Sequence, residues 1–180
     1  MENQRKFNIA IVGPNASGKT TLINRLKFGD DIPLNYETTS NDKDTETHTF
    51  NIQLNDGPLT LNLIEVSKSF IKCNEDLVYV NNNKIHVDCI ILIFDTTSLE
   101  SLNQSSLIKY EALGTFGKDK PIILVGNNED SVYKKDVVKY MNYYPLYKNH
   151  VNAKDLITYI LRYVYYNNGI CINSQIPFEH

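Results

Sequence analysis

Residues 13–20 read GPNASGKT, and their types and spacing are those of a loop that can hold a phosphate group. Gly13 and Gly18 permit backbone angles that turn successive N–H groups toward an anion at the start of the following helix. Lys19 can reach the outer phosphates of a nucleotide, and the Thr20 hydroxyl can be a ligand of Mg²⁺. The pattern therefore predicts a nucleotide site, and the alternative is a glycine turn that only caps a helix. The expected phosphate-site residues are Gly13, Asn15, Ala16, Ser17, Gly18, Lys19, Thr20 and Thr21.

A second candidate segment, Asn127-Asn128-Glu129-Asp130, follows the apolar run IILVG at 122–126. The Asp130 carboxylate can accept hydrogen bonds from both N–H groups on the Watson–Crick edge of guanine, whereas adenine has no such pair of donors. The spacing N-x-x-D is weak by itself, because Asp130 could instead cap a helix. Its place directly after a buried strand, and about a hundred residues after the phosphate loop, favours a guanine site.

The elements that must position these residues follow from periodicity. Apolar runs predict buried strands at 7–12, 89–94 and 122–126, and alternation predicts an antiparallel hairpin from strands 50–54 and 59–63. Helices are expected at 20–26, 98–112, 136–141 and 155–166, with a last short strand at 147–151. Residues 27–46 and 68–88 are polar and are expected to form long loops. This alternation predicts one α/β domain over residues 1–180, with ligands at the carboxyl ends of the strands.

Composition excludes some classes of function. A net charge of −3 argues against nucleic acid as a partner, because binding the phosphate backbone needs clustered lysine and arginine. Three cysteines without CxxC spacing favour a reducing, cytoplasmic location. The longest apolar run, 89–94, is too short to span a bilayer, and no lipidation motif is encoded. We therefore expect no membrane anchor in this chain.

With these motifs in place, the chain resembles small GTPases of the Ras superfamily, most closely Rab-like members, over residues 7–166. GPNASGKT matches the first motif of the family, and three further segments are similar to it: FDTTSLESL at 94–102, VGNNED at 125–130 and VNAK at 151–154. The resemblance implies a P-loop NTPase fold, with a mainly parallel six-stranded sheet, one antiparallel edge strand and helices on both faces. It also implies that GTP or GDP binds with Mg²⁺. The base would be read by Asp130 and the Ala153 N–H beside Lys154, while Asn127 braces the phosphate loop.

The resemblance fails where the family carries DxxG followed by a catalytic glutamine, because this chain reads Glu65-Val66-Ser67-Lys68-Ser69 there. Glu65 can still hold Mg²⁺ through water. Lys68 lacks the freedom of glycine to swing toward the γ-phosphate, and Ser69 is too short to orient the attacking water. We therefore assign no catalytic residue, with Lys68 as an alternative surrogate cation. Asn128 replaces the lysine that covers the base, which predicts weakened nucleotide binding.

The segment Tyr36-Glu37-Thr38-Thr39 resembles the family's first switch, whose threonine joins Mg²⁺. The local pattern favours Thr39, whereas an ungapped count from Thr20 favours Thr38; we take Thr39, and the alternative is an ordinary polar loop. The expected metal ligands are thus Thr20, Thr39 and Glu65. Effectors or regulators are expected to bind through residues 36–52 and 65–88.

The function that these features favour is a guanine-nucleotide switch with slow or impaired GTP hydrolysis. A second hypothesis is a non-catalytic interaction module in which the nucleotide is structural. A third is an adenine-specific ATPase, since GPNASGKTT is similar to the first motif of transport ATPases. No LSGGQ-like segment follows it, and the chain is short for that class.

Overall fold

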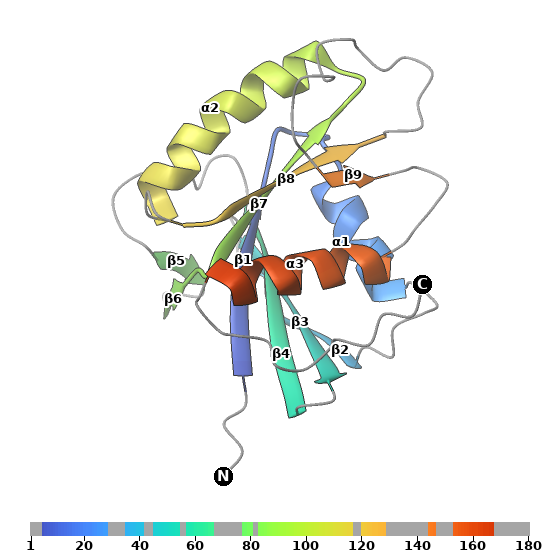
Figure 1. Cartoon of the computed structure of the whole chain (residues 1–180). Coiled ribbons are helices and arrows are strands. Elements are labelled where there is room, and N and C mark those ends of the chain that lie inside the picture. Colours follow the sequence, from blue (N-terminus) through green and yellow to red (C-terminus); the bar gives the residue numbers. More distant parts are fainter. Residues whose placement is uncertain are drawn as a thin grey trace.

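The computed structural model describes residues 5–28, 35–41, 45–54, 57–66, 77–80, 83–116, 120–128, 144–146 and 153–167. Figure 1 shows the strands and helices, with the strands β2 to β7 following one another between α1 and α2. The strands are β1 (Arg5–Val12), β2 (Asn35–Asn41), β3 (Thr45–Leu54), β4 (Gly57–Val66), β5 (Leu77–Val80), β6 (Asn83–His86), β7 (Cys89–Asp95), β8 (Ile122–Asn127) and β9 (Tyr144–Leu146). The helices are α1 (Lys19–Phe28), α2 (Leu99–Phe116) and α3 (Ala153–Asn167).

Seven of the described strands form the main sheet, in the order β2-β3-β4-β1-β7-β8-β9. Strand β1 pairs in parallel with β4 and β7, and β8 pairs in parallel with β7 and β9. Strand β3 is antiparallel to both of its neighbours. The expected mainly parallel α/β sheet is confirmed. The expected six strands and antiparallel edge strand are wrong, because β2 adds a seventh strand outside β3 and moves the antiparallel strand to the interior.

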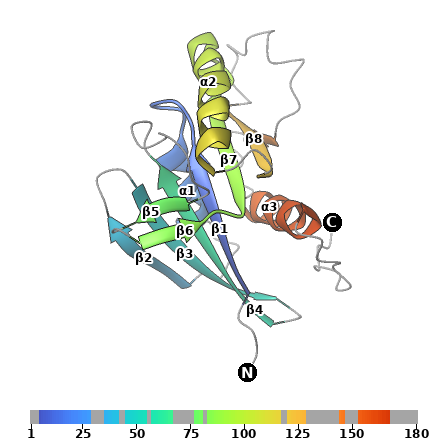
Figure 2. The same cartoon turned by 90° about the vertical axis from the view of Figure 1, so that its left-hand side faces the viewer.

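Three strands that were not expected, β2, β5 and β6, lie in segments expected to be loops. Strand β2 has no apolar alternation, but its threonines favour extended backbone, and an edge strand needs no second buried face. Strand β3 begins at Thr45, earlier than expected, for the same reason. Strands β5 and β6 form an antiparallel hairpin of their own outside the main sheet (Figure 2). The loop expectation is wrong at both segments: β2 lies in polar sequence, whereas β5 reads LVYV, an apolar run that is itself a strand signal.

The other expected elements are mostly confirmed. The expected strand at 7–12 lies within β1, and the expected hairpin from 50 to 63 lies within β3 and β4. Strands β7 and β8 contain the expected runs at 89–94 and 122–126. Helices α1 and α3 contain the expected ranges, and α2 covers 98–112 except its first residue. The expected helix at 136–141 and strand at 147–151 lie outside the described residues, and the last described strand is β9.

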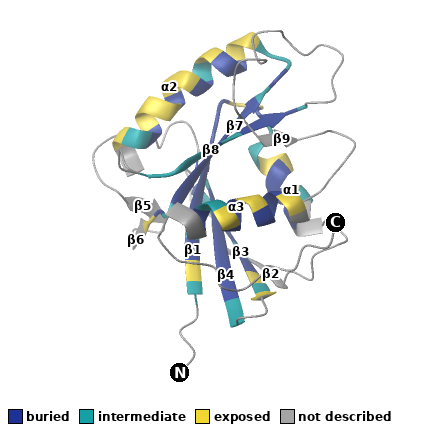
Figure 3. Cartoon of the chain, in the orientation of Figure 1, coloured by how far each residue is buried: buried dark blue, intermediate teal, exposed yellow. Residues whose placement is uncertain are grey.

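Helices cover both faces of the sheet, as expected. Alternate residues of the strands pack against α1 and α3 on one face, where Ile9, Leu63 and Ile91 are fully buried. The residues between them pack against α2 on the other face, where Ala10, Ile64 and Ile90 are fully buried. Figure 3 shows the resulting pattern of buried strands and helices with one buried and one exposed side. Among the described residues, no helix is both long and apolar enough to cross a membrane.

The core encloses a free thiol at the start of β7. Burial raises the pKa of Cys89 to about 12, and the nearby Asp88 carboxylate adds to the shift against a backbone hydrogen bond to Ile90. At pH 8 only about one thiol in ten thousand is then ionised, and the thiolate is the reactive form. In a Cys73→Ser/Cys171→Ser protein, we expect Cys89 to react with a thiol reagent only after denaturation. Reaction of the native protein as fast as free cysteine would contradict this burial.

Candidate functional site

Residues 13–18 join β1 to α1 in a loop shaped to hold an anion. Ala16 and Gly18 adopt left-handed backbone angles, with φ of 60° and 103°. The Ser17 N–H donates to the Pro14 carbonyl oxygen at 3.3 Å, and the Leu22 N–H donates to the Gly18 carbonyl oxygen at 2.8 Å. Helix α1 therefore begins immediately behind the loop, where its first N–H groups have no intrahelical acceptor. Such a curved backbone at a helix N-terminus is an anion nest.

Neighbouring strands press directly against this loop, which explains its glycines. A Cβ atom on Gly18 would lie 2.2 Å from the Asn127 side-chain nitrogen at the end of β8. A Cβ atom on Gly13 would lie 2.2 Å from the Ile93 carbonyl oxygen in β7. The Asn127 Nδ2 group donates to the Ser17 carbonyl oxygen at 3.1 Å across 110 residues of sequence. The loop is thus held against the ends of two strands.

Lys19 lies half-buried inside the loop. Its Nζ atom donates to the carbonyl oxygens of Gly13 and Pro14, at 3.0 and 2.9 Å. Burial lowers the pKa of Lys19, and the Glu65 carboxylate partly opposes that shift. A cation that has lost much of its water gains strongly from a nearby phosphate, and an ammonium group carries three N–H donors. This position therefore fits a phosphate ligand.

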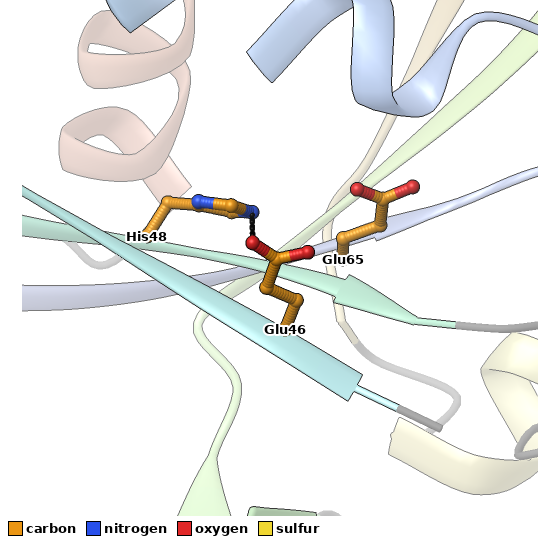
Figure 4. A group of neighbouring side chains, drawn as sticks. All are labelled: Glu46, His48 and Glu65. Carbon is orange, nitrogen blue, oxygen red and sulfur yellow. Dashed lines mark ion pairs between the residues drawn. The ribbon is translucent and has the colours of Figure 1, made fainter. Parts of the chain in front are cut away.

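The Thr20 hydroxyl donates to Glu65 Oε1 at 2.7 Å, joining the first turn of α1 to the carboxyl end of β4. A hydroxyl and a carboxylate are oxygen ligands of the kind that Mg²⁺ prefers, so the residues present fit this ion. Two residues that the sequence analysis missed lie beside them. Glu46 and His48 of β3 bring their ligand atoms and that of Glu65 within 4.8 Å of one another (Figure 4). Their i, i+2 spacing is a usable signal only on a strand, and the sequence predicts a loop at residue 46.

The third expected metal ligand is placed elsewhere. Thr39 belongs to β2, at a register shift between Thr38 and Ser40. Strand β3 separates β2 from β4, so the backbone of Thr39 is two strand spacings, about 10 Å, from the strand that carries Glu65. The structure thus brings Thr20 and Glu65 together and sets Thr39 on the edge strand. The side chains of Thr38 and Thr39 are outside the described part.

The segments expected to meet the base lie at the carboxyl end of β8 and the start of α3. The Thr96 hydroxyl donates to the Asn127 carbonyl oxygen at 2.8 Å and secures the end of β8. Asn128 follows in a left-handed conformation with φ of 62°, which asparagine tolerates better than most residues. Ala153 and Lys154 open α3. Three expected site residues lie outside the described residues: Lys68, Ser69 and Asp130.

Comparison with protein families matches residues 8–150 to the Ras family. The match covers most of the chain and includes the phosphate loop, the β4 carboxylate and Asn127. The chain belongs to the Ras family. A search of curated proteins finds no match.

Membership of the Ras family gives the site its ligand class. Ras-family proteins are small GTPases with the P-loop α/β fold, which bind GTP and GDP. The chain is therefore a GTP-binding small GTPase. The resemblance to small GTPases of the Ras superfamily, inferred from the sequence, is confirmed.

Gly18 gives a direct test of the packed loop in this Ras-family protein. Gly18→Ala forces an unfavourable φ on alanine and displaces Asn127, so we expect GTP affinity to fall at least about tenfold and the melting temperature to fall. Gly114→Ala is the matched control, because an added Cβ there has no neighbour within 4 Å. In helix α2 it should leave affinity unchanged and raise stability by up to about 1 kcal/mol. Equal behaviour of the two variants in calorimetric titrations would contradict the packing.

Proposed function

We propose that residues 1–180 form one Rab-like switch domain that binds GTP or GDP with Mg²⁺ and hydrolyses GTP slowly or not at all. The observation that carries the proposal is the phosphate loop with Thr20 bonded to Glu65 at 2.7 Å. That contact puts a hydroxyl and a carboxylate where a nucleotide-bound cation needs oxygen ligands. Three cysteines without metal or redox spacing support a cytoplasmic location.

In this proposal the loop N–H groups and Lys19 hold the phosphates. Thr20 would be a direct ligand of Mg²⁺, and Glu65, which accepts a hydrogen bond from Thr20, would act through water. Thr39 would complete the metal site only if its segment moved from the edge of the sheet. The base would be bound by two segments. One follows β8 and contains Asn127, Asn128 and Asp130, and the other is the start of α3 at Ala153 and Lys154. Mg²⁺ would supply charge neutralisation at the phosphates.

Slow hydrolysis is expected from the residues that stand where the family has DxxG and the catalytic glutamine. Ser69 is too short to orient water where the family has glutamine, and Lys68 replaces a glycine. Asn15 is exposed at the front of the phosphate loop. Its side chain would crowd an arginine supplied by an activating partner. In this proposal the chain retains the residues that bind the nucleotide and lacks the side chain that positions the attacking water.

A second candidate function is a non-catalytic module whose nucleotide is structural. The pairing of β2 with β3 favours it, because the segment expected to respond to GTP is hydrogen-bonded to the sheet edge. In either case, residues 36–52 and 65–88 would contact effector or regulator proteins. Equal affinity of a captured partner for the GTP and GDP forms would favour the non-catalytic module.

Base choice tests the proposal. Asp130→Ala should weaken GTP binding by tenfold or more while leaving ATP binding nearly unchanged, because the guanine donors lose their acceptor. Lys19→Ala is the comparison, since loss of a charge-assisted contact worth about 1.5–3 kcal/mol should weaken both nucleotides alike. Competitive titration with the two nucleotides measures both effects. Retention of the wild-type preference for guanine in Asp130→Ala would show that the base is read elsewhere.

Hydrolysis tests the second half of the proposal. We expect single-turnover phosphate release from GTP-loaded protein to be slower than the intrinsic rate of Ras, on the order of 10⁻⁴ s⁻¹. Ser69→Gln should raise the rate if only the water-positioning side chain is lacking, and Lys68→Gly/Ser69→Gln should raise it further. A rate well above about 10⁻³ s⁻¹ for the unmodified chain without a partner would contradict the proposal.

A further inference from the structure

Glu46, His48 and Glu65 form a cluster beside the phosphate loop, and the proposed guanine-nucleotide site uses only Glu65 of the three. The two β3 residues lie on the same face of the strand, since they are two positions apart. Glu65 lies directly opposite Glu46 in the antiparallel pair of β3 and β4. Figure 4 shows the three side chains directed toward one space between the strands and the start of α1.

The two carboxylates of this cluster would gain from a shared cation. Two carboxylates directly opposite each other on neighbouring strands repel, and like charges in that position destabilise a sheet. The His48 side chain is 3 % exposed, and the Glu46 side chain is 39 % exposed, so the cluster runs from the core to the surface. A divalent cation would bind both carboxylates and convert their repulsion into attraction.

The distances fit metal ligation. Zinc bonds to histidine nitrogen and carboxylate oxygen are about 2.0–2.2 Å, so two ligands of a tetrahedral ion lie about 3.4 Å apart. His48 Nε2 and Glu46 Oε1 are 3.5 Å apart and form an ion pair when His48 is protonated, drawn as the dashed line in Figure 4. All three ligand atoms lie within 4.8 Å of one another, so a carboxylate shift of about an ångström closes the group around one ion.

Glu65, one of the three proposed metal ligands, is held in place by a residue outside the cluster. The Thr20 hydroxyl donates to Glu65 Oε1 at 2.7 Å, and metal-binding carboxylates are commonly oriented by such a hydrogen bond. The imidazole decides the kind of metal. Histidine nitrogen suits zinc and related transition metals, whereas Mg²⁺ takes oxygen ligands.

We propose that Glu46, His48 and Glu65 bind one divalent transition-metal ion, represented here by Zn²⁺. The site shares Glu65 with the proposed Mg²⁺ position but takes a nitrogen ligand that Mg²⁺ does not favour. Three protein ligands leave a coordination position for water. The site is formed by paired strands of the sheet, so zinc binding does not depend on the proposed base choice or hydrolysis.

The test is a zinc titration of purified Cys73→Ser/Cys171→Ser protein with a chromophoric zinc indicator. Excess MgCl₂ is kept present so that sites made only of oxygen are filled by Mg²⁺. We expect one Zn²⁺ to bind per chain, with a dissociation constant in the micromolar range or lower. Glu46→Gln should weaken zinc at least about tenfold, because loss of a residue that merely orients a ligand already costs about 10–100-fold.

Two further variants separate the site from other histidines. His86 is exposed and does not belong to the cluster; it forms an ion pair with Asp88 at 3.5 Å. His86→Gln should therefore leave zinc affinity unchanged. His48→Gln should abolish binding, with circular dichroism to verify its fold. Cobalt(II) bound to the unmodified site should show ligand-field bands that disappear in Glu46→Gln.

Two results would overturn the proposal: absence of stoichiometric zinc binding, or equal zinc affinity in Glu46→Gln and His86→Gln. Nucleotide content measured on the same samples by chromatography keeps this outcome separate from the guanine-nucleotide proposal. A protein that carries GDP but binds no zinc would lack only the metal site. A protein that binds zinc but no guanine nucleotide would lack only the nucleotide function.

Discussion

The contact between Gly18 and Asn127 is the constraint on which the site depends. The backbone must pass so close to β8 that no side chain fits at residue 18, and the Asn127 amide donates to the loop at the same place. This contact joins the first strand–helix turn to a strand more than a hundred residues later. Movement of β8 would therefore change the curvature of the phosphate loop.

The two-faced core keeps these segments in register. Strands β1, β7 and β8 are parallel neighbours, so their carboxyl ends meet at one edge of the sheet. Helices α1 and α3 on one face and α2 on the other bury alternate residues of the strands. A one-residue slip would send each core side chain to the opposite face, which makes the register costly to change.

The side of the phosphate loop that faces β3 and β4 is more polar. Glu65 of β4 is bonded to Thr20 and lies opposite Glu46, while the buried His48 follows on the same face of β3. The extra edge strand β2 covers the outside of β3. These three ionisable side chains lie together near the phosphate loop. The segment that resembles the first switch forms the edge strand β2.

The sequence by itself determined the phosphate loop, the alternation of strands and helices and the family, because these depend on local spacing and apolar periodicity. Residues 13–20 specify an anion nest wherever a strand precedes them and a helix follows. Tertiary structure alone decided which distant residues meet. Strand β2 has no apolar pattern and exists through pairing with β3, so the sheet order could not be predicted. Likewise, Glu46 and Glu65 become neighbours only because the antiparallel register of β3 and β4 places them opposite each other.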